Sequence, residues 1–91
     1  MFKFQAIAEG SLLTSVGSYD CMSSKFEAGS AHVATKGYIV TLIGGLTLGV
    51  VFQTEECGKQ WVAIDRMGTF WSSYGNTRNH AAQWLLKRAR A

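Results

Sequence analysis

The sequence predicts an α+β fold in which an antiparallel β-meander of about four to six strands packs against one C-terminal amphipathic helix. Alternating apolar and polar residues, separated by turn-forming residues, extend from about residue 38 to residue 74. Apolar residues at helical spacing then run from about residue 77 to residue 90. The 91 residues include no proline, internal repeat or linker-like stretch, so residues 1–91 are expected to form a single domain.

The first strand is expected within residues 2–9, where Phe2 and Phe4 alternate with Lys3 and Gln5. A period of two is typical of a strand that buries one face. A glycine ends the pattern at position 10.

The segment of residues 11–37 is rich in serine and glycine, and we expect it to be mostly loop. Its short apolar pieces, residues 12–13 and 31–34, are candidates for one or two short strands. A long loop in so small a domain would itself be a candidate functional surface.

A hairpin is expected at residues 38–53, with Gly44 and Gly45 as a two-residue turn. Paired glycines supply the positive φ angles that such a turn needs. Residues 38–52 carry no charge, but this stretch is shorter than the ~20 residues of a membrane-spanning helix, and the central glycines favour a hairpin. No membrane association is therefore expected.

The second strand of this hairpin alternates, which predicts one shared face for Leu46, Leu48, Val50 and Phe52. Gly49 interrupts the strand. A glycine at such a position indicates a β-bulge or a close backbone approach.

Two further strands are expected at residues 60–65 and 69–74. In the first, Trp61 and Ala63 share one face and Val62 and Ile64 share the other.

In the last strand, Trp71 alternates with Phe70 and Tyr74. If one sheet face meets the helix, Trp71 or Trp61 is expected to face away from it. An exposed tryptophan beside Arg66 would be a binding hot spot. Packing of this tryptophan in the core or on the N-terminal strand is the alternative.

The helix is expected to begin after Asn76 or Thr77, either of which can cap its first turn. Trp84 is expected at the edge of the buried stripe. The stripe itself consists of Ala81, Ala82, Leu85, Leu86 and Ala89.

Charge is distributed unevenly along the chain. Residues 1–76 hold five basic and six acidic groups, whereas residues 77–91 hold Arg78, Lys87, Arg88 and Arg90 and no acid. The overall charge of +3 therefore comes from the helix. These cations either contact phosphates or an acidic protein surface, or form a solvated helix end that favours the helix dipole.

The sequence offers little material for catalysis or metal binding. Cys21, Cys57, His32 and His80 do not show metal-ligand spacing, and the few acidic groups are scattered. No phosphate-binding loop or other cofactor motif is found. We therefore expect no metal, no cofactor and no enzymatic activity. No signal peptide is seen, so two reduced thiols in an intracellular protein are favoured over one disulfide.

Residues 61–68 (WVAIDRMG), followed by residues 76–78 (NTR) and 81–85 (AAQWL), resemble a pattern of small phage and mobile-element proteins. The shared pattern is a hairpin with an Asp-x-x-Gly turn and then a Thr-Arg-capped helix, and it covers about the last third of the chain. The resemblance implies a stoichiometric inhibitor of host machinery, including bacterial defence systems. Some such proteins resemble the DNA-binding arms of phage-type integrases, but here only Lys59 and Arg66 lie near the last two strands.

The favoured function is therefore protein–protein interaction, as a phage-encoded inhibitor of the anti-CRISPR type acting on a host protein or complex in the cytoplasm. Nucleic-acid binding by the basic helix is the alternative, and a homodimer through a sheet edge is a further possibility. The expected binding residues are Trp71, Arg66, Arg78, Trp84, Lys87, Arg88 and Arg90.

Overall fold

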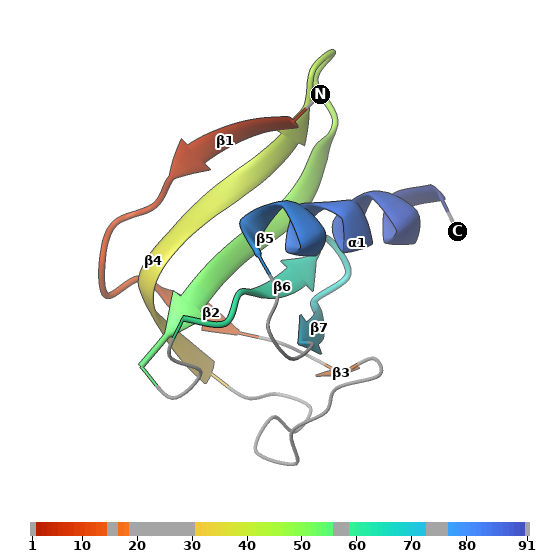
Figure 1. Cartoon of the computed structure of the whole chain (residues 1–91). Coiled ribbons are helices and arrows are strands. Elements are labelled where there is room, and N and C mark those ends of the chain that lie inside the picture. Colours follow the sequence, from red (N-terminus) through yellow and green to blue (C-terminus); the bar gives the residue numbers. More distant parts are fainter. Residues whose placement is uncertain (1, 15–16, 19–30, 56–58, 73–76, 91) are drawn as a thin grey trace.

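The computed structural model of the protein describes residues 2–14, 17–18, 31–55, 59–72 and 77–90. The described elements are seven strands and one helix (Figure 1). They are β1 (Phe2–Ala6), β2 (Leu12–Thr14), β3 (Gly17–Ser18), β4 (Ala31–Leu42), β5 (Thr47–Thr54), β6 (Val62–Asp65), β7 (Thr69–Ser72) and α1 (Arg78–Arg90).

The central sheet has the strand order β1-β4-β5-β6-β7, and all neighbours in this series are antiparallel. Strands β4 to β7 follow one another in sequence and in space, as a meander does. Helix α1 crosses one face of this sheet (Figure 1). The predicted α+β fold, an antiparallel meander packed against one C-terminal helix, is confirmed.

Strands β1 and β2 lie along the same edge of β4. β1 pairs with the C-terminal half of β4 and β2 with its first residues, in nearly continuous register. Between them, the N–H of Gly10 donates to the carbonyl of Ala34 at 2.8 Å, and the N–H of Ala34 donates to the carbonyl of Ser11 at 2.9 Å. β3 follows β2 closely and pairs in parallel with β7, at the other end of the sheet. β2 and β3 therefore join opposite sides of the sheet.

Strand β4 begins earlier than the sequence predicts. The candidate strands at residues 12–13 and 31–34 are confirmed as β2 and the start of β4, but residues 35–37 were expected to be loop and also belong to the 12-residue strand β4. His32 and Ala34 are buried while Val33 and Thr35 are exposed, so the strand period is present. The pattern is hard to recognise because the buried side chains include a histidine and a small alanine. The expected loop at 19–30 lies outside the described residues.

The hairpin between β4 and β5 confirms the glycine turn but not its length. Gly44 and Gly45 have φ angles of 116° and 114°. The N–H of Gly45 donates to the carbonyl of Leu42, and the N–H of Leu42 donates to the carbonyl of Leu46. The turn therefore contains residues 43–45 rather than two residues.

Gly49 marks a β-bulge and a close approach, as predicted. The register between β4 and β5 shifts where Val40 pairs with Gly49 and Thr41 with Thr47. A side chain at position 49 would collide with the carbonyl oxygen of Ile64 and would place its Cβ 2.9 Å from Cδ2 of Leu85. The backbone there has a φ of 153°.

The bulge overturns the predicted single face for Leu46, Leu48, Val50 and Phe52. Leu48 packs under α1, whereas Phe52 belongs to the cluster on the opposite face and Val50 packs against that cluster. The extra residue of the bulge breaks strict alternation, so the side chains after it point to the other face.

The sheet separates two apolar clusters. The predicted faces of residues 61–64 are confirmed, because Trp61 and Ala63 lie on the helix side and Val62 and Ile64 on the other. The helix-side cluster contains Val40, Leu48, Val51, Ala63, Ala81, Ala82, Trp84, Leu85 and Leu86. The opposite cluster contains Ala34, Phe52, Val62 and Ile64.

Helix α1 begins at Arg78, directly after its cap. The hydroxyl oxygen of Thr77 accepts the N–H of His80 at 3.2 Å, while Asn76, the other candidate cap, lies outside the described residues. The predicted buried stripe is confirmed, with Ala89 half-buried. Trp84, expected at the edge of the stripe, is buried.

We expect Gly49→Ala to destabilise the protein by about 3 kcal/mol, because a Cβ there meets backbone atoms in a conformation that L-residues avoid. Gly45→Ala is the matched control, since position 45 also has positive φ but no atom lies within 4 Å of the point where a Cβ would stand, and it should cost about 1 kcal/mol. Urea unfolding measures both. Equal losses of stability in the two variants would mean that close packing at position 49 does not contribute to the free energy of unfolding.

Candidate functional site

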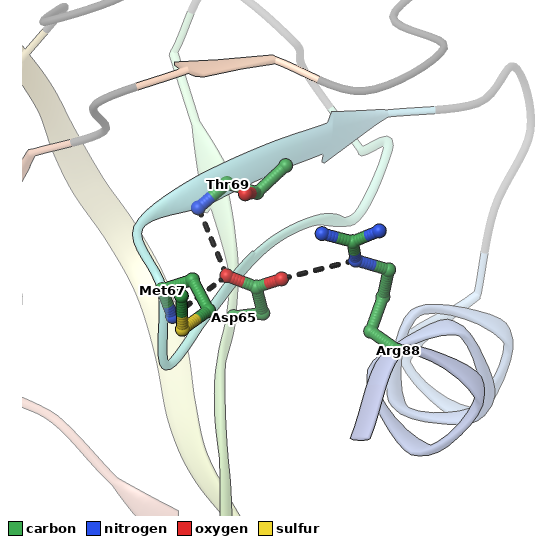
Figure 2. Close-up of polar contacts among 4 residues, drawn as sticks. All are labelled: Asp65, Met67, Thr69 and Arg88. Carbon is green, nitrogen blue, oxygen red and sulfur yellow. Dashed lines mark hydrogen bonds and ion pairs between the residues drawn. The ribbon is translucent and has the colours of Figure 1, made fainter. Parts of the chain in front are cut away.

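The carboxylate of Asp65 organises the turn between β6 and β7. Its Oδ1 accepts the backbone N–H groups of Met67 and Thr69, each at 2.9 Å. Its Oδ2 lies 3.1 Å from Nε of Arg88 on α1, so one side chain joins the turn to the helix (Figure 2).

The local sequence explains this geometry. Asp65 has a short acceptor side chain that can reach backbone N–H groups two and four residues later. Gly68 donates its N–H to the carbonyl of Asp65 and has a φ of 85°, a conformation that glycine adopts without strain. Asp-x-x-Gly therefore produces a tight three-residue turn, residues 66–68.

Arg88 acts as a cross-link between the end of α1 and this turn. Its guanidinium also lies 5.8 Å from the ring centroid of Trp84. The Asp65 side chain is nearly buried, whereas the Arg88 side chain is about one-third exposed. Solvent weakens such a pair, but its charged hydrogen bond still contributes on the order of 1 kcal/mol.

The turn presents two exposed side chains, Arg66 and Met67. Met67 is 77% exposed, more than any other large apolar side chain described. Arg66, Met67 and Arg88 line a recess of about 30 Å³ between the turn and the helix. A recess of this size holds about one water molecule, so the surface suits contact with a macromolecule better than enclosure of a small ligand. We call residues 66, 67 and 88 the turn surface.

The seven expected binding residues do not form one patch. Arg66 and Arg88 meet at the turn surface, and Lys87 and Arg90 are exposed on the last turn of α1. Arg78 lies ten positions before Arg88, about 15 Å away along the helix axis.

Arg78 is engaged within the protein rather than standing in solvent. Its guanidinium carbon lies 4.2 Å from the ring centroid of Phe4 and 5.0 Å from that of Tyr38. Cation–π contacts at this distance are favourable. The asymmetry in charge is therefore partly structural, because Arg78 and Arg88 both hold α1 to the sheet.

The expectation that Trp71 or Trp61 faces away from the helix is wrong. Trp71 stacks on Trp84 of α1 with centroids 5.2 Å apart and planes 12° apart. Trp61 stacks on Tyr38 at 6.0 Å and packs against the same cluster. The alternative of a core partner is confirmed for Trp71. It occupies this face because it pairs with Ala63, whose small side chain leaves room beneath the helix.

Sequence reasoning missed Asp65 and Met67 as site residues. The Asp-x-x-Gly spacing was a usable signal for the turn. The length of that turn also fixes the register between the two strands that it joins, β6 and β7. That register could have placed Trp71 beside Ala63, and therefore on the same sheet face as Trp61.

Other expectations about chemistry are tested only in part. Among the described residues, no group of three or more His, Cys, Asp and Glu side chains is placed to hold a metal ion. No helix in the described ranges has the length and apolar character needed to cross a membrane. Cys21 and Cys57 lie outside the described residues. The absence of enzymatic activity and the cytoplasmic location stay predictions.

Comparison with known proteins found no matching family model, curated protein or solved structure.

Replacing Arg88 by Ala should destabilise the protein by about 1–2 kcal/mol, because the buried carboxylate of Asp65 loses a charged donor. Lys87→Ala is the matched control, because Lys87 is an exposed cation one position earlier, and it should change stability by less than about 0.5 kcal/mol. Chemical denaturation of both variants checks this. Indistinguishable midpoints would show that the cross-link is not stabilising.

Proposed function

We propose that the protein is a small non-enzymatic binding protein that docks on an acidic surface of a partner protein through the turn surface and the adjoining end of α1. The observation that carries the proposal is the turn itself. Asp65 holds its backbone through two hydrogen bonds, and the turn displays Met67 beside Arg66.

A rigid turn of this kind favours binding for two reasons. A conformation that is already fixed loses little entropy when the complex forms. Methionine and arginine are also enriched at protein interfaces, where an apolar side chain fills a pocket and the cation recognises a carboxylate. Lys87 and Arg90 add two exposed cations on the last turn of α1, on either side of Arg88 in the sequence.

The geometry favours a protein partner over nucleic acid. Binding by phosphate contacts depends on the number of cations that reach the backbone of the nucleic acid. Arg78 lies over two aromatic rings and Arg88 pairs with Asp65. Met67, a highly exposed side chain of the turn surface, is apolar.

The identity of the partner is the part of the proposal that rests on the resemblance of residues 61–85. It implies a host protein or complex as the partner, and a phage-encoded inhibitor of a defence system, of the anti-CRISPR type, as the role. Such a protein would act in the host cytoplasm by occupying a surface of its target.

Affinity capture from a host lysate, with and without nuclease, tests the proposal. We expect Met67→Ala and Arg66→Glu each to reduce the captured partner at least tenfold, as interface hot spots do. Lys36→Glu is the control, because it makes the same charge reversal at an exposed position on β4. Capture that is equally strong for all variants would overturn the assignment of the turn surface.

A salt titration of the purified complex separates the two partner classes. Phosphate contacts predict a loss of roughly one log unit of affinity per log unit of salt for each phosphate neutralised. For a protein partner we expect a shallow dependence and capture that survives nuclease. A steep slope, lost on changing Lys87 and Arg90 to Ala, would favour nucleic-acid binding instead.

A further inference from the structure

Strand β1 forms one edge of the sheet. In the described part of the chain it pairs with β4 on its inner side and with no strand on its outer side. Figure 1 shows β1 as the outermost strand, at the edge opposite β7. Lys3, Gln5 and Ala6 are exposed along it. An edge of this kind presents unpaired backbone groups to other chains.

The hydrogen-bond pattern identifies which backbone groups point outward. The N–H of Ile7 donates to the carbonyl of Gly37 on β4 at 3.0 Å. Because backbone groups of an antiparallel strand alternate in direction, Lys3 and Gln5 also direct theirs toward β4. The N–H and carbonyl groups of Phe4 and Ala6 therefore point away from the sheet.

A groove accompanies this edge on the helix side. It has a volume of about 310 Å³ and is lined by Phe2, Phe4, Asn79 and Gln83. The two phenylalanine side chains are half-buried and the two amide side chains are exposed. The groove therefore offers an apolar floor with polar groups on one wall, next to outward-pointing backbone groups.

The charge around this edge is positive. Lys3 is exposed on the sheet face opposite the helix, since it alternates with Phe2 and Phe4. On the helix side, the Arg78 guanidinium lies 4.2 Å from the Phe4 centroid. Neither β1 nor residues 78–83 of α1 contain a carboxylate. An acidic segment complements this edge.

We propose that the outer edge of β1 is a strand-addition site for an extended segment of a partner protein in which apolar and acidic residues alternate. The backbone of the segment pairs with Phe4 and Ala6. Its apolar side chains enter the groove, and its carboxylates on the opposite face meet Lys3. This is a known mode of peptide recognition, in which backbone bonds supply affinity and alternate side chains supply specificity.

A second copy of the chain fits this edge less well. It would bring another Lys3 and another Arg78 to a surface that already carries these cations, and like charges across paired strands are unfavourable. The site is also separate from the turn surface, because β4, β5 and β6 lie between β1 and β7. The strand-addition proposal can therefore be tested independently of the function proposed above.

Amide hydrogen exchange of the full chain tests the site with a synthetic octapeptide of alternating valine and glutamate. In the free protein, the amides of Phe4 and Ala6 should exchange faster than those of Gln5 and Ile7. Saturating peptide should slow exchange at Phe4 and Ala6 at least tenfold and leave Gln5 and Ile7 unchanged. Unchanged exchange at Phe4 and Ala6 would overturn the proposal.

Two peptide controls need no variant of the protein. A peptide with lysine in place of glutamate should bind at least tenfold more weakly. A peptide methylated on the backbone nitrogens that face β1 should not protect Phe4 or Ala6. Equal binding of either control would contradict charge-selective strand addition. Protection that grows with protein concentration in the absence of peptide would make a second copy the occupant and overturn the proposal.

Ala6→Pro removes one outward N–H and leaves the inward bonds to β4 in place. It should weaken peptide binding at least tenfold, whereas Ala6→Val, which keeps the N–H, should bind as the unaltered protein does. Circular dichroism reports whether both variants are folded. Undiminished binding by a folded Ala6→Pro protein would exclude pairing at this edge.

Discussion

The position of α1 depends on the missing side chain at Gly49. Cδ2 of Leu85 approaches to within 2.9 Å of where a Cβ would stand, and Cα of Asp65 lies 3.0 Å from the same point. The helix can therefore sit low over β5 and β6, with Ala81 and Ala82 completely buried beneath it. A side chain at position 49 would lift the helix and separate the groups at both of its ends.

The contacts at the two ends of α1 follow from this close packing. At the C-terminal end, Arg88 reaches the carboxylate of Asp65 at 3.1 Å. At the N-terminal end, Arg78 lies over Phe4 and Tyr38. Some of the cations that the sequence suggests for binding therefore hold the helix in place instead. A cation near an aromatic ring or a carboxylate is stabilised within the molecule. Of the cations on α1, Lys87 and Arg90 remain exposed for a partner.

Features that depend on the pattern of nearby residues in the sequence were predictable. Features that depend on contacts between residues far apart in the sequence were not. The faces of residues 61–64 and the buried stripe of α1 follow from short-range periodicity, and both are observed. The bulge at Gly49 was anticipated, but its effect on Leu48 depends on the pairing with β4. The bond from Arg88 to Asp65 joins residues 23 positions apart, and no local signal specifies it. The candidate site was found in part, since Arg66 and Arg88 were named but Met67 was not.

The two proposed surfaces lie at opposite ends of one sheet, and this limits how they can work together. A standard interface covers about 800 Å² on each partner, and the whole chain exposes 5493 Å². The outer edge of β1 and the turn beyond β6 are separated by β4, β5 and β6, and α1 covers one face of the sheet between them. Two partners, or one partner with an extended arm, can use both surfaces at once. An arm that adds to β1 while its parent domain contacts the turn would gain affinity from being tethered, without any additional contact.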